Sequence, residues 1–174
     1  LGMRHFIRAV AVAGALCAAA PAVADDNRTE VLGNWYRMIL ELVRHTPTYT
    51  PPVASRSFAY TALVAYEATA SGDGALRTLA GQVNGLPPAP PREEGAAYDE
   101  DAILNAALAR AVDVYFANTG PTGQRAKAAL SRLLGEKVAE GVAPATLARS
   151  EAYGVALAEE IISASESDGG AVIE

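Results

Sequence analysis

Residues 99–118 read DEDAILNAALARAVDVYFAN and carry the clearest helical pattern of the chain. The stretch opens on three acidic residues, Asp99 to Asp101, which the positive end of a helix dipole stabilises. Apolar residues then recur three or four positions apart, so they share one face of a helix. We expect this segment to form the longest helix of the protein, with a buried stripe made of Leu104, Leu108, Ala111, Val112 and Tyr115.

Similar apolar periods on both sides of this segment predict five more helices, separated by prolines and glycines. No stretch alternates with the period of two that a half-buried strand requires. The predicted class is therefore all-α, a bundle of about six helices packed through small residues. Apart from residues 99–118, the expected helices cover residues 34–45, 53–70, 75–83, 126–141 and 144–168.

Each long helix has a predicted buried stripe of its own. Small residues dominate the stripe of the helix at 53–70, so a neighbouring helix can approach it closely; its members are Phe58, Ala62, Ala65, Tyr66 and Thr69. The other predicted stripes are Trp35, Met38, Ile39, Leu42 and Val43 in the first helix, Ala126, Leu130, Leu133, Leu134 and Val138 in the fifth, and Tyr153, Leu157 and Ile161 in the last.

The segment GLPPAPP at residues 85–91 contains four prolines in five residues, which forces an extended connection at the surface. Two interpretations are open. The segment is either a docking peptide for an aromatic groove or a stiff loop within one domain.

The first 24 residues have the three parts of a secretory signal peptide. Residues 3–8 form a short basic start, and residues 9–20 form an apolar run that is too short to span a membrane comfortably. Small side chains then precede a predicted cut between Ala24 and Asp25. Residues 1–24 are therefore predicted to be removed on export.

Cleavage there leaves a helical domain of residues 25–174, and Leu1 and Gly2 are extra residues ahead of the natural-looking start at Met3. The loss of two of the 14 basic residues and none of the 20 acidic ones changes the formal charge from −6 to −8. An acidic chain lacks the basic surface that nucleic acid requires, and a chain without cysteine suits an oxidising compartment. We predict a bacterial periplasmic or secreted protein with no nucleic-acid partner and no stable membrane span after cleavage.

The sequence has few candidates for chemistry. Its paired carboxylates lie in a loop, at a helix start or at neighbouring helix positions, where they do not face one another as an acid and a base. The one histidine after the cut, His45, has no cysteine or second histidine with which to hold a metal. The serines lack the G-x-S-x-G setting of a nucleophile. We predict no catalytic, cofactor-binding or metal-binding residue in this chain; the other candidates weighed are Glu93, Glu94, Asp99, Asp101, Glu159, Glu160, Ser55, Ser57 and Ser131.

Two stretches resemble a known family. Residues 51–68, PPVASRSFAYTALVAYEA, are similar to a segment of bacterial vanadium-dependent haloperoxidase-like proteins, in which a Pro-Pro pair opens a helix of the form A-x-R-x-x-A followed by an aliphatic-A-x-Y-[DE]-A run. Residues 150–161, SEAYGVALAEEI, followed by Asp168-Gly169, are similar to that family's G-x-x-[VI]-A helix and D-G end. The helix that starts at Asn34-Trp35 resembles the family's opening helix, so the resemblance covers nearly all of residues 30–170.

The resemblance implies the helical core of the type 2 phosphatidic acid phosphatase superfamily and a site for vanadate or phosphate. Family enzymes use K-x6-R-P, Ser-Gly-His and S-R-x5-H, in which cations neutralise an oxyanion and a histidine bonds its metal or attacks its phosphorus. No Ser-Gly-His occurs in this chain. The other near matches lack the decisive residue. Where K-x6-R-P needs an arginine, seven residues after Lys127 and Lys137, this chain has Leu134 and Pro144. Where S-R-x5-H needs a histidine, seven residues after Ser55 and Ser131, it has Ala62 and Val138.

We therefore expect residues 25–174 to be the N-terminal helical part of a secreted haloperoxidase-like enzyme, incomplete at its C-terminus and without site residues of its own. The resemblance implies peroxide-dependent halide oxidation, with vanadate as the cofactor of the complete enzyme. A phosphatase of the same superfamily is one alternative, and a non-catalytic periplasmic helical binding or partner module is another. An apolar face is expected to be covered by the missing C-terminal half or by a second chain, including another copy in a homo-oligomer.

Overall fold

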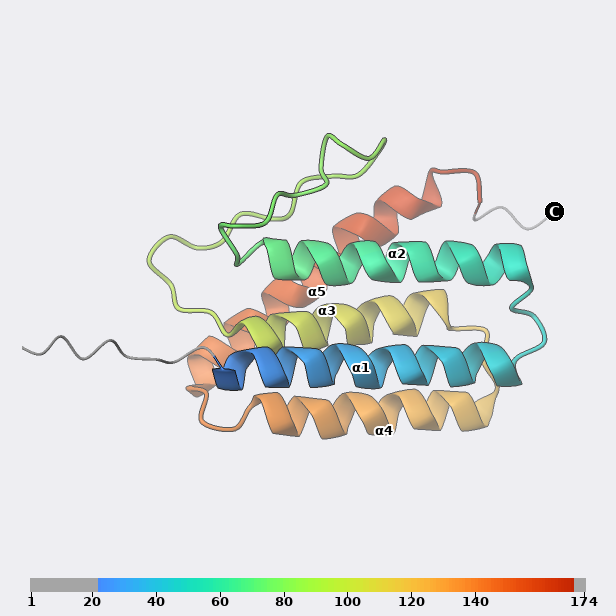
Figure 1. Ribbon diagram of the computed structural model, residues 1–174, viewed down its shortest axis with the longest axis horizontal. Coiled ribbons are helices and arrows are strands. Elements are labelled where there is room, and N and C mark those ends of the chain that lie inside the picture. The colour runs from blue at the N-terminus through green and yellow to red at the C-terminus, as the bar shows by residue number, and fades with distance from the viewer. Residues whose placement is uncertain (1–21, 171–174) are drawn as a thin grey trace, which may run out of the picture.

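The computed structural model describes residues 22–170, and within this range the chain forms α-helices and no strand (Figure 1). The all-α prediction is confirmed, whereas the bundle of about six helices is not: the described residues form five. They are α1 (Ala22–His45), α2 (Pro51–Ala70), α3 (Glu100–Tyr115), α4 (Pro121–Val138) and α5 (Pro144–Glu166).

The helix α3 lies at the centre of the bundle and packs against each of the other four helices. The Asp99 carboxylate caps it by accepting a hydrogen bond from the Ala102 N–H at 2.8 Å. All five residues of its predicted stripe are buried, and so are Ile103 and Ala107, because a helix enclosed on several sides buries more than one stripe. The expected length was wrong: with 16 residues, α3 is the shortest of the five helices rather than the longest.

The helix α1 begins well before the predicted helix at 34–45. Its first turns are mostly polar, so the apolar period did not mark them; Val31, one turn ahead of Trp35, extends the buried stripe. The basic start and apolar run of the predicted signal peptide lie outside the described residues. The predicted cut falls in the first turn of α1, so cleavage there would leave nearly the whole helix in the mature protein.

None of the described helices combines the length and the apolar character needed to cross a membrane.

The expected helix at 75–83 is absent, and this segment forms turns instead. Its backbone is held by Glu67 of α2, whose buried carboxylate accepts hydrogen bonds from the Leu79 N–H at 2.6 Å and the Thr78 hydroxyl at 2.7 Å. Gly81 has a φ of 75°, a left-handed conformation that ends any helical run. The prediction failed because an apolar period does not reveal a distant carboxylate that competes for backbone N–H groups.

Replacing Glu67 with alanine is expected to release the segment around Thr78 and Leu79 from α2. Hydrogen bonds to charged groups contribute about 1.5–3 kcal/mol each, so the Leu79 amide should exchange its hydrogen at least about tenfold faster. Hydrogen exchange followed by NMR measures this. Glu67→Gln is the matched control, because its amide oxygen can still accept one of the two bonds, and its exchange rate should lie between the other two. Unchanged exchange in Glu67→Ala would contradict the anchoring role.

The buried faces of α2 and α4 are rotated from their predicted stripes. In α2, Ala62 is exposed, whereas Thr61 and Val64 are fully buried. In α4, Leu133 is 62% exposed although its neighbour Leu134 is buried. In α2, small residues occur on several faces, so the period alone does not determine which face turns inward. In α4, the predicted stripe contained two adjacent leucines, which point in different directions on a helix, and only Leu134 faces the core. The predicted stripe of α5, with its larger side chains, is confirmed: Tyr153, Leu157 and Ile161 are buried.

The connection between α2 and α3 makes side-chain contacts with the bundle. Leu86 is buried, and the Tyr153 hydroxyl donates a hydrogen bond to the Pro90 carbonyl at 3.0 Å. The Arg92 guanidinium lies over the Tyr153 ring, 5.0 Å from its centroid. These contacts favour the second of the two interpretations of residues 85–91, a stiff loop inside the domain.

Candidate functional site

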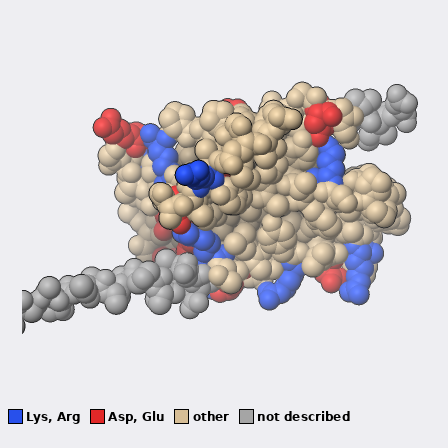
Figure 2. Space-filling view, turned by 45° about the horizontal axis from the view of Figure 1, so that its top comes forward, with Lys and Arg blue, Asp and Glu red and all other residues tan. Residues whose placement is uncertain are grey.

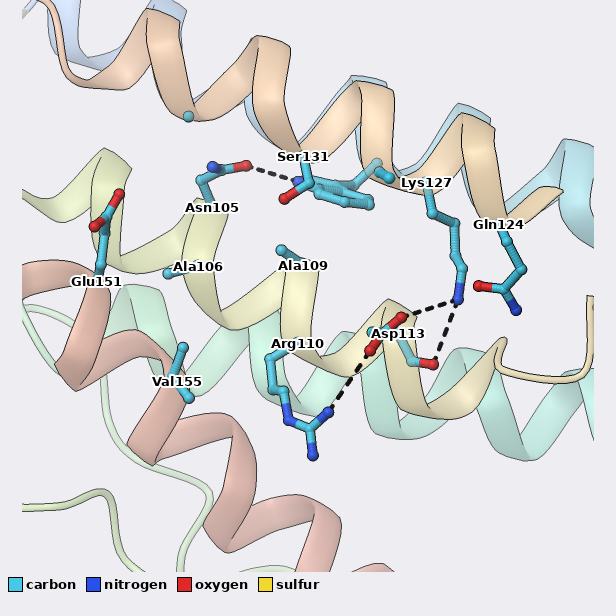
Figure 3. A pocket seen from close by; sticks show the side chains of 13 residues that line it. Asn105, Ala106, Ala109, Arg110, Asp113, Gln124, Lys127, Ser131, Glu151 and Val155 are labelled. Carbon is cyan, nitrogen blue, oxygen red and sulfur yellow. Dashed lines mark hydrogen bonds and ion pairs between the residues drawn. The ribbon is translucent and has the colours of Figure 1, made fainter. Parts of the chain in front are cut away.

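A cleft of about 510 Å³ opens between α4 and α5, with α3 as its floor (Figure 3). Ala106 and Ala109 of α3 form the apolar floor. Lys127 and Ser131 line it from α4, and Val155 lines it from α5. Ligand sites in proteins commonly have this size and combine an apolar lining with a few polar groups, so this cleft is the candidate functional site.

Lys127 is buried at one end of the cleft, and its side chain is 6% exposed. Its ammonium donates hydrogen bonds to the Asp113 carbonyl at 3.4 Å, the Asp113 carboxylate at 3.2 Å and the Phe116 carbonyl at 3.2 Å. Both carbonyls lie at the C-terminal end of α3, where a helix leaves C=O groups unpaired and where a cation is favoured. All three N–H groups of the ammonium are engaged, so Lys127 caps α3 and is not a free cation.

Arg110 of α3 also lines the cleft and is likewise engaged. Its Nε lies 2.5 Å from the Glu159 carboxylate of α5, and its Nη1 lies 3.8 Å from the Asp113 carboxylate. Asp113 therefore lies between two cations, as Figure 3 shows. The polar end of the cleft is a closed network that ties α3 to α4 and α5.

This arrangement does not fit vanadate or phosphate. An oxyanion site needs unpaired cationic donors, and both cations that line the cleft already bind carboxylates. His45 lies at the end of α1 with its side chain 73% exposed, and its Nε2 is 3.2 Å from the Glu41 carboxylate. Among the described residues, no group of three or more His, Cys, Asp or Glu side chains could hold a metal ion.

The other residues weighed from the sequence have local roles or lie at the surface. The Ser55 hydroxyl donates to the Pro51 carbonyl at 2.8 Å, and the Ser57 hydroxyl donates to the Tyr115 carbonyl at 3.3 Å. Among the carboxylates, Asp99 caps α3, Asp101 lies 3.7 Å from Arg28, Glu159 binds Arg110, Glu93 lies 3.4 Å from Arg149, and Glu94 and Glu160 are exposed.

A second polar cluster joins α2 to the end of α5. The Arg56 guanidinium donates to both oxygens of the Asp168 carboxylate, at 3.1 and 3.2 Å, and to the Ser165 carbonyl at 2.5 Å. The Tyr60 hydroxyl donates to the same carboxylate at 2.6 Å. Hydrogen bonds from Arg56 and then Tyr60 lower the pKa of Asp168 to about 2. Burial is the main cause, and the hydrogen bond to Asp168 the second, of a rise in the pKa of Tyr60 to about 12.

The stability that Asp168 contributes is expected to disappear in acid. An aspartate in an unfolded chain has a pKa of about 3.9, whereas that of Asp168 in the folded protein is about 2. The Asp168 carboxylate therefore stabilises the folded protein fully above about pH 3.9, and this stabilisation is lost as the pH falls through about 2. The melting temperature of Asp168→Asn should therefore lie below that of the wild type at pH 6 and approach it at pH 2. Circular dichroism melts of both proteins across this range measure the difference. A gap that stays constant with pH would contradict the role of the carboxylate charge.

Sequence reasoning missed the polar residues of α3 that shape the cleft. One signal was present, because Asn105 directly follows Leu104 of the predicted stripe and a polar residue in a buried position requires a partner. That partner is Trp35, whose indole N–H donates to the Asn105 carbonyl oxygen at 2.9 Å. The two residues are 70 positions apart, and no sequence pattern reveals such a pair.

On the face shown in Figure 2, the Lys and Arg side chains are spread over the surface, and several lie next to acidic side chains. A surface that binds nucleic acid has its cations gathered along one path. This face of the described residues has no such path.

Comparisons with protein-family models, with curated proteins and with solved structures found no match to this chain.

Proposed function

We propose that this chain is the N-terminal helical portion of a secreted vanadium-dependent haloperoxidase-like enzyme, which uses peroxide to oxidise halide. The observation that supports the proposal is the contact between two of the stretches that carry the resemblance. Arg56, from the first stretch, and Asp168, from the D-G end, are 112 positions apart and form a bidentate ion pair. Chance similarity between alanine-rich helices would not be expected to make distant motif residues meet.

Other residues of the same stretches also hold the fold together. Glu67 of the Y-[DE]-A run anchors the connection after α2. Gly154 lies at a close approach of α5 to α3, since a side chain there would meet the α3 backbone. In the proposed enzyme these residues form a scaffold, and the groups that bind vanadate are supplied by residues outside this chain.

The coding DNA in frame beyond Glu174 provides the first test. We expect an open frame that encodes K-x6-R-P, Ser-Gly-His and a later histidine within about 300 codons, the length of one large domain. A stop codon directly after Glu174, or a frame without these motifs, would refute the enzyme assignment.

The protein encoded by the full frame then separates the two chemistries. A haloperoxidase should brominate an indicator dye only when orthovanadate, bromide and hydrogen peroxide are all present. A phosphatase should hydrolyse p-nitrophenyl phosphate without vanadate, and vanadate should inhibit it because it occupies the phosphate site. Residues 25–174 alone are the matched control and should show neither activity.

A second candidate function is a non-catalytic helical partner module, favoured by an apolar stripe along α1 that the fold covers only in part. Leu40 is 59% exposed, and Tyr36 and Val43, one turn away on either side, are half-buried against the core. A partner that completed the burial of this stripe would gain from removing its apolar surface from water. In the proposed enzyme the rest of the protein covers this stripe; in a partner module a second chain does. The stop codon that would refute the enzyme assignment would leave this candidate standing.

A further inference from the structure

Two side-chain polar atoms of the described residues are buried and have no hydrogen-bond partner: Arg92 Nε and one carboxylate oxygen, Oδ1, of Asp101. Arg92 is compensated in other ways. Its guanidinium lies over the rings of Tyr98 and Tyr153, 5.0 Å from each centroid, and its Nη atoms bind the Glu100 carboxylate at 2.6 and 2.7 Å. The Asp101 oxygen has no comparable compensation, so it is the unsatisfied group that needs an explanation.

Asp101 lies in the first turn of α3 and faces Arg28, near the start of α1. Its side chain is 14% exposed, and Arg28 Nε lies 3.7 Å from the buried oxygen, beyond hydrogen-bond distance. The contact is therefore an ion pair without a hydrogen bond. Such a pair offsets only part of the cost of burying a carboxylate.

The other charged groups on the first turn of α3 oppose a charge on Asp101. Burial, followed by the charge of Asp99, raises the pKa of Asp101, and Glu100 acts in the same direction. Arg28 of α1 acts against them and lowers this pKa. The positive end of the α3 dipole favours a carboxylate, but Asp99 already occupies the capping position.

The elements that adjoin this turn give Asp101 no second cation among the described residues. From α5, the Ser150 hydroxyl meets the turn by accepting a hydrogen bond from the Asp99 N–H at 2.8 Å. The cations of the adjoining elements are already paired: Arg92 with Glu100, Lys137 with Glu30, and Arg149 with Glu93.

We propose that the contact between Arg28 and Asp101 is a proton-sensitive joint between α1 and α3, which tightens when Asp101 takes up a proton and loosens when it ionises. An ionised Asp101 leaves a charged oxygen buried without a donor, whereas a neutral carboxyl group avoids that cost. Movement of α1 away from α3 lets water reach the oxygen, so the open arrangement favours the charged form.

The direction of the pH dependence follows from the raised pKa. The stabilisation by the neutral carboxyl group is complete below about pH 3.9, the ordinary value for aspartate, and is lost as the pH rises through the folded-state pKa of Asp101. This direction is opposite to that of Asp168, whose pKa is lowered. The inference goes beyond the proposed enzyme function and does not depend on it.

Hydrogen exchange followed by NMR tests the joint in the full chain, by comparing the wild type with Asp101→Asn, whose side chain has a similar shape and is neutral at every pH. The amides of residues 31–34 report on the joint, because they bond to carbonyls one turn back, next to Arg28. The two proteins should be equally protected at pH 3. At pH 7 the wild type should exchange about threefold faster, the effect of one partly exposed charge. The same ratio of rates at both pH values, or slower exchange in the wild type at pH 7, would overturn the proposal.

Arg28→Gln tests the joint from the side of α1. Loss of the guanidinium should accelerate the exchange of residues 31–34 at pH 7 and leave it unchanged at pH 3. The carboxyl carbon resonance of Asp101 should titrate above about pH 3.9 in the wild type, and at a higher pH in this variant. Glu160→Gln, which removes an exposed carboxylate of α5, is the control for net charge and should alter neither readout. An Asp101 midpoint that Arg28→Gln leaves unmoved would also overturn the proposal.

Discussion

Replacement of Gly154 with alanine is expected to destabilise the protein by about 3 kcal/mol, the upper end of the usual cost of overpacking. A Cβ atom at this position would lie 2.3 Å from the Ile103 carbonyl oxygen and 3.1 Å from the Ala107 nitrogen. Both are backbone atoms of α3, so no side-chain rotation relieves the clash. The variant must separate α5 from α3, the pair of helices with the most extensive contact in the bundle.

Thermal unfolding followed by circular dichroism measures this effect. For a chain of this length, 3 kcal/mol corresponds to a decrease in melting temperature of about 10 °C. Gly135→Ala is the matched control, because the nearest atom to its new Cβ is the Asn105 amide nitrogen at 4.0 Å, an ordinary contact. Alanine is the better helix former by up to about 1 kcal/mol, so this variant should be as stable as the wild type or more so. Equal melting temperatures for the two variants would contradict the close approach of α5 to α3.

The close approach also gives a physical reason for a residue that the family resemblance singled out. Gly154 is the glycine of the stretch at residues 150–161 that is similar to the G-x-x-[VI]-A helix. Its neighbours on the same face, Leu157 and Ala158, are buried against the core. A glycine followed by an apolar face is what a helix needs to lie directly on a neighbouring backbone. The same pattern would be required in any protein that packs two helices in this way, whatever its chemistry.

The buried faces of α3 and α5 were predictable from the sequence because large apolar side chains recur in them at helical spacing. Leu104 and Leu108 in α3, and Leu157 and Ile161 in α5, are buried where their spacing placed them. The face of α2 was not predictable, since alanine and serine occur on most of its sides. Periodicity reports which side of a helix is apolar, but it contains no information about which helices become neighbours.

The candidate cleft depended on such neighbours and could not be read from the sequence. Its polar end requires Lys127 of α4 to meet the last turn of α3, and the position of the Asn105 amide requires the hydrogen bond from Trp35 of α1. Each of these contacts joins residues from different helices. A lysine in an amphipathic helix is ordinarily expected to lie at the surface, so the burial of Lys127 is evident only once α3 ends beside it.

Replacing Lys127 with methionine is the second large expected effect, a loss of about 2–3 kcal/mol. Methionine keeps the length and apolar stem of the side chain but removes all three donors. The Phe116 carbonyl then loses the ammonium that donates a hydrogen bond to it. The C-terminal end of α3 also loses the cation that balances its dipole. Urea unfolding at pH 7 measures the free energy, and the amide exchange of residues in the last turn of α3 should accelerate along with it.

Arg132→Met is the matched control for this variant. Arg132 lies on the same helix with its side chain 74% exposed, and its ion pair with Glu136 at 3.8 Å is of the kind that contributes less than about 1 kcal/mol. Both substitutions remove one positive charge from α4, so a general effect of net charge would destabilise the two proteins equally. A cap on α3 predicts that only Lys127→Met is strongly destabilised. Lys127 donates hydrogen bonds to two backbone carbonyls as well as to the Asp113 carboxylate. Asp113→Asn should therefore lower the free energy of unfolding by less than Lys127→Met does. This difference separates capping of the helix from a simple ion pair.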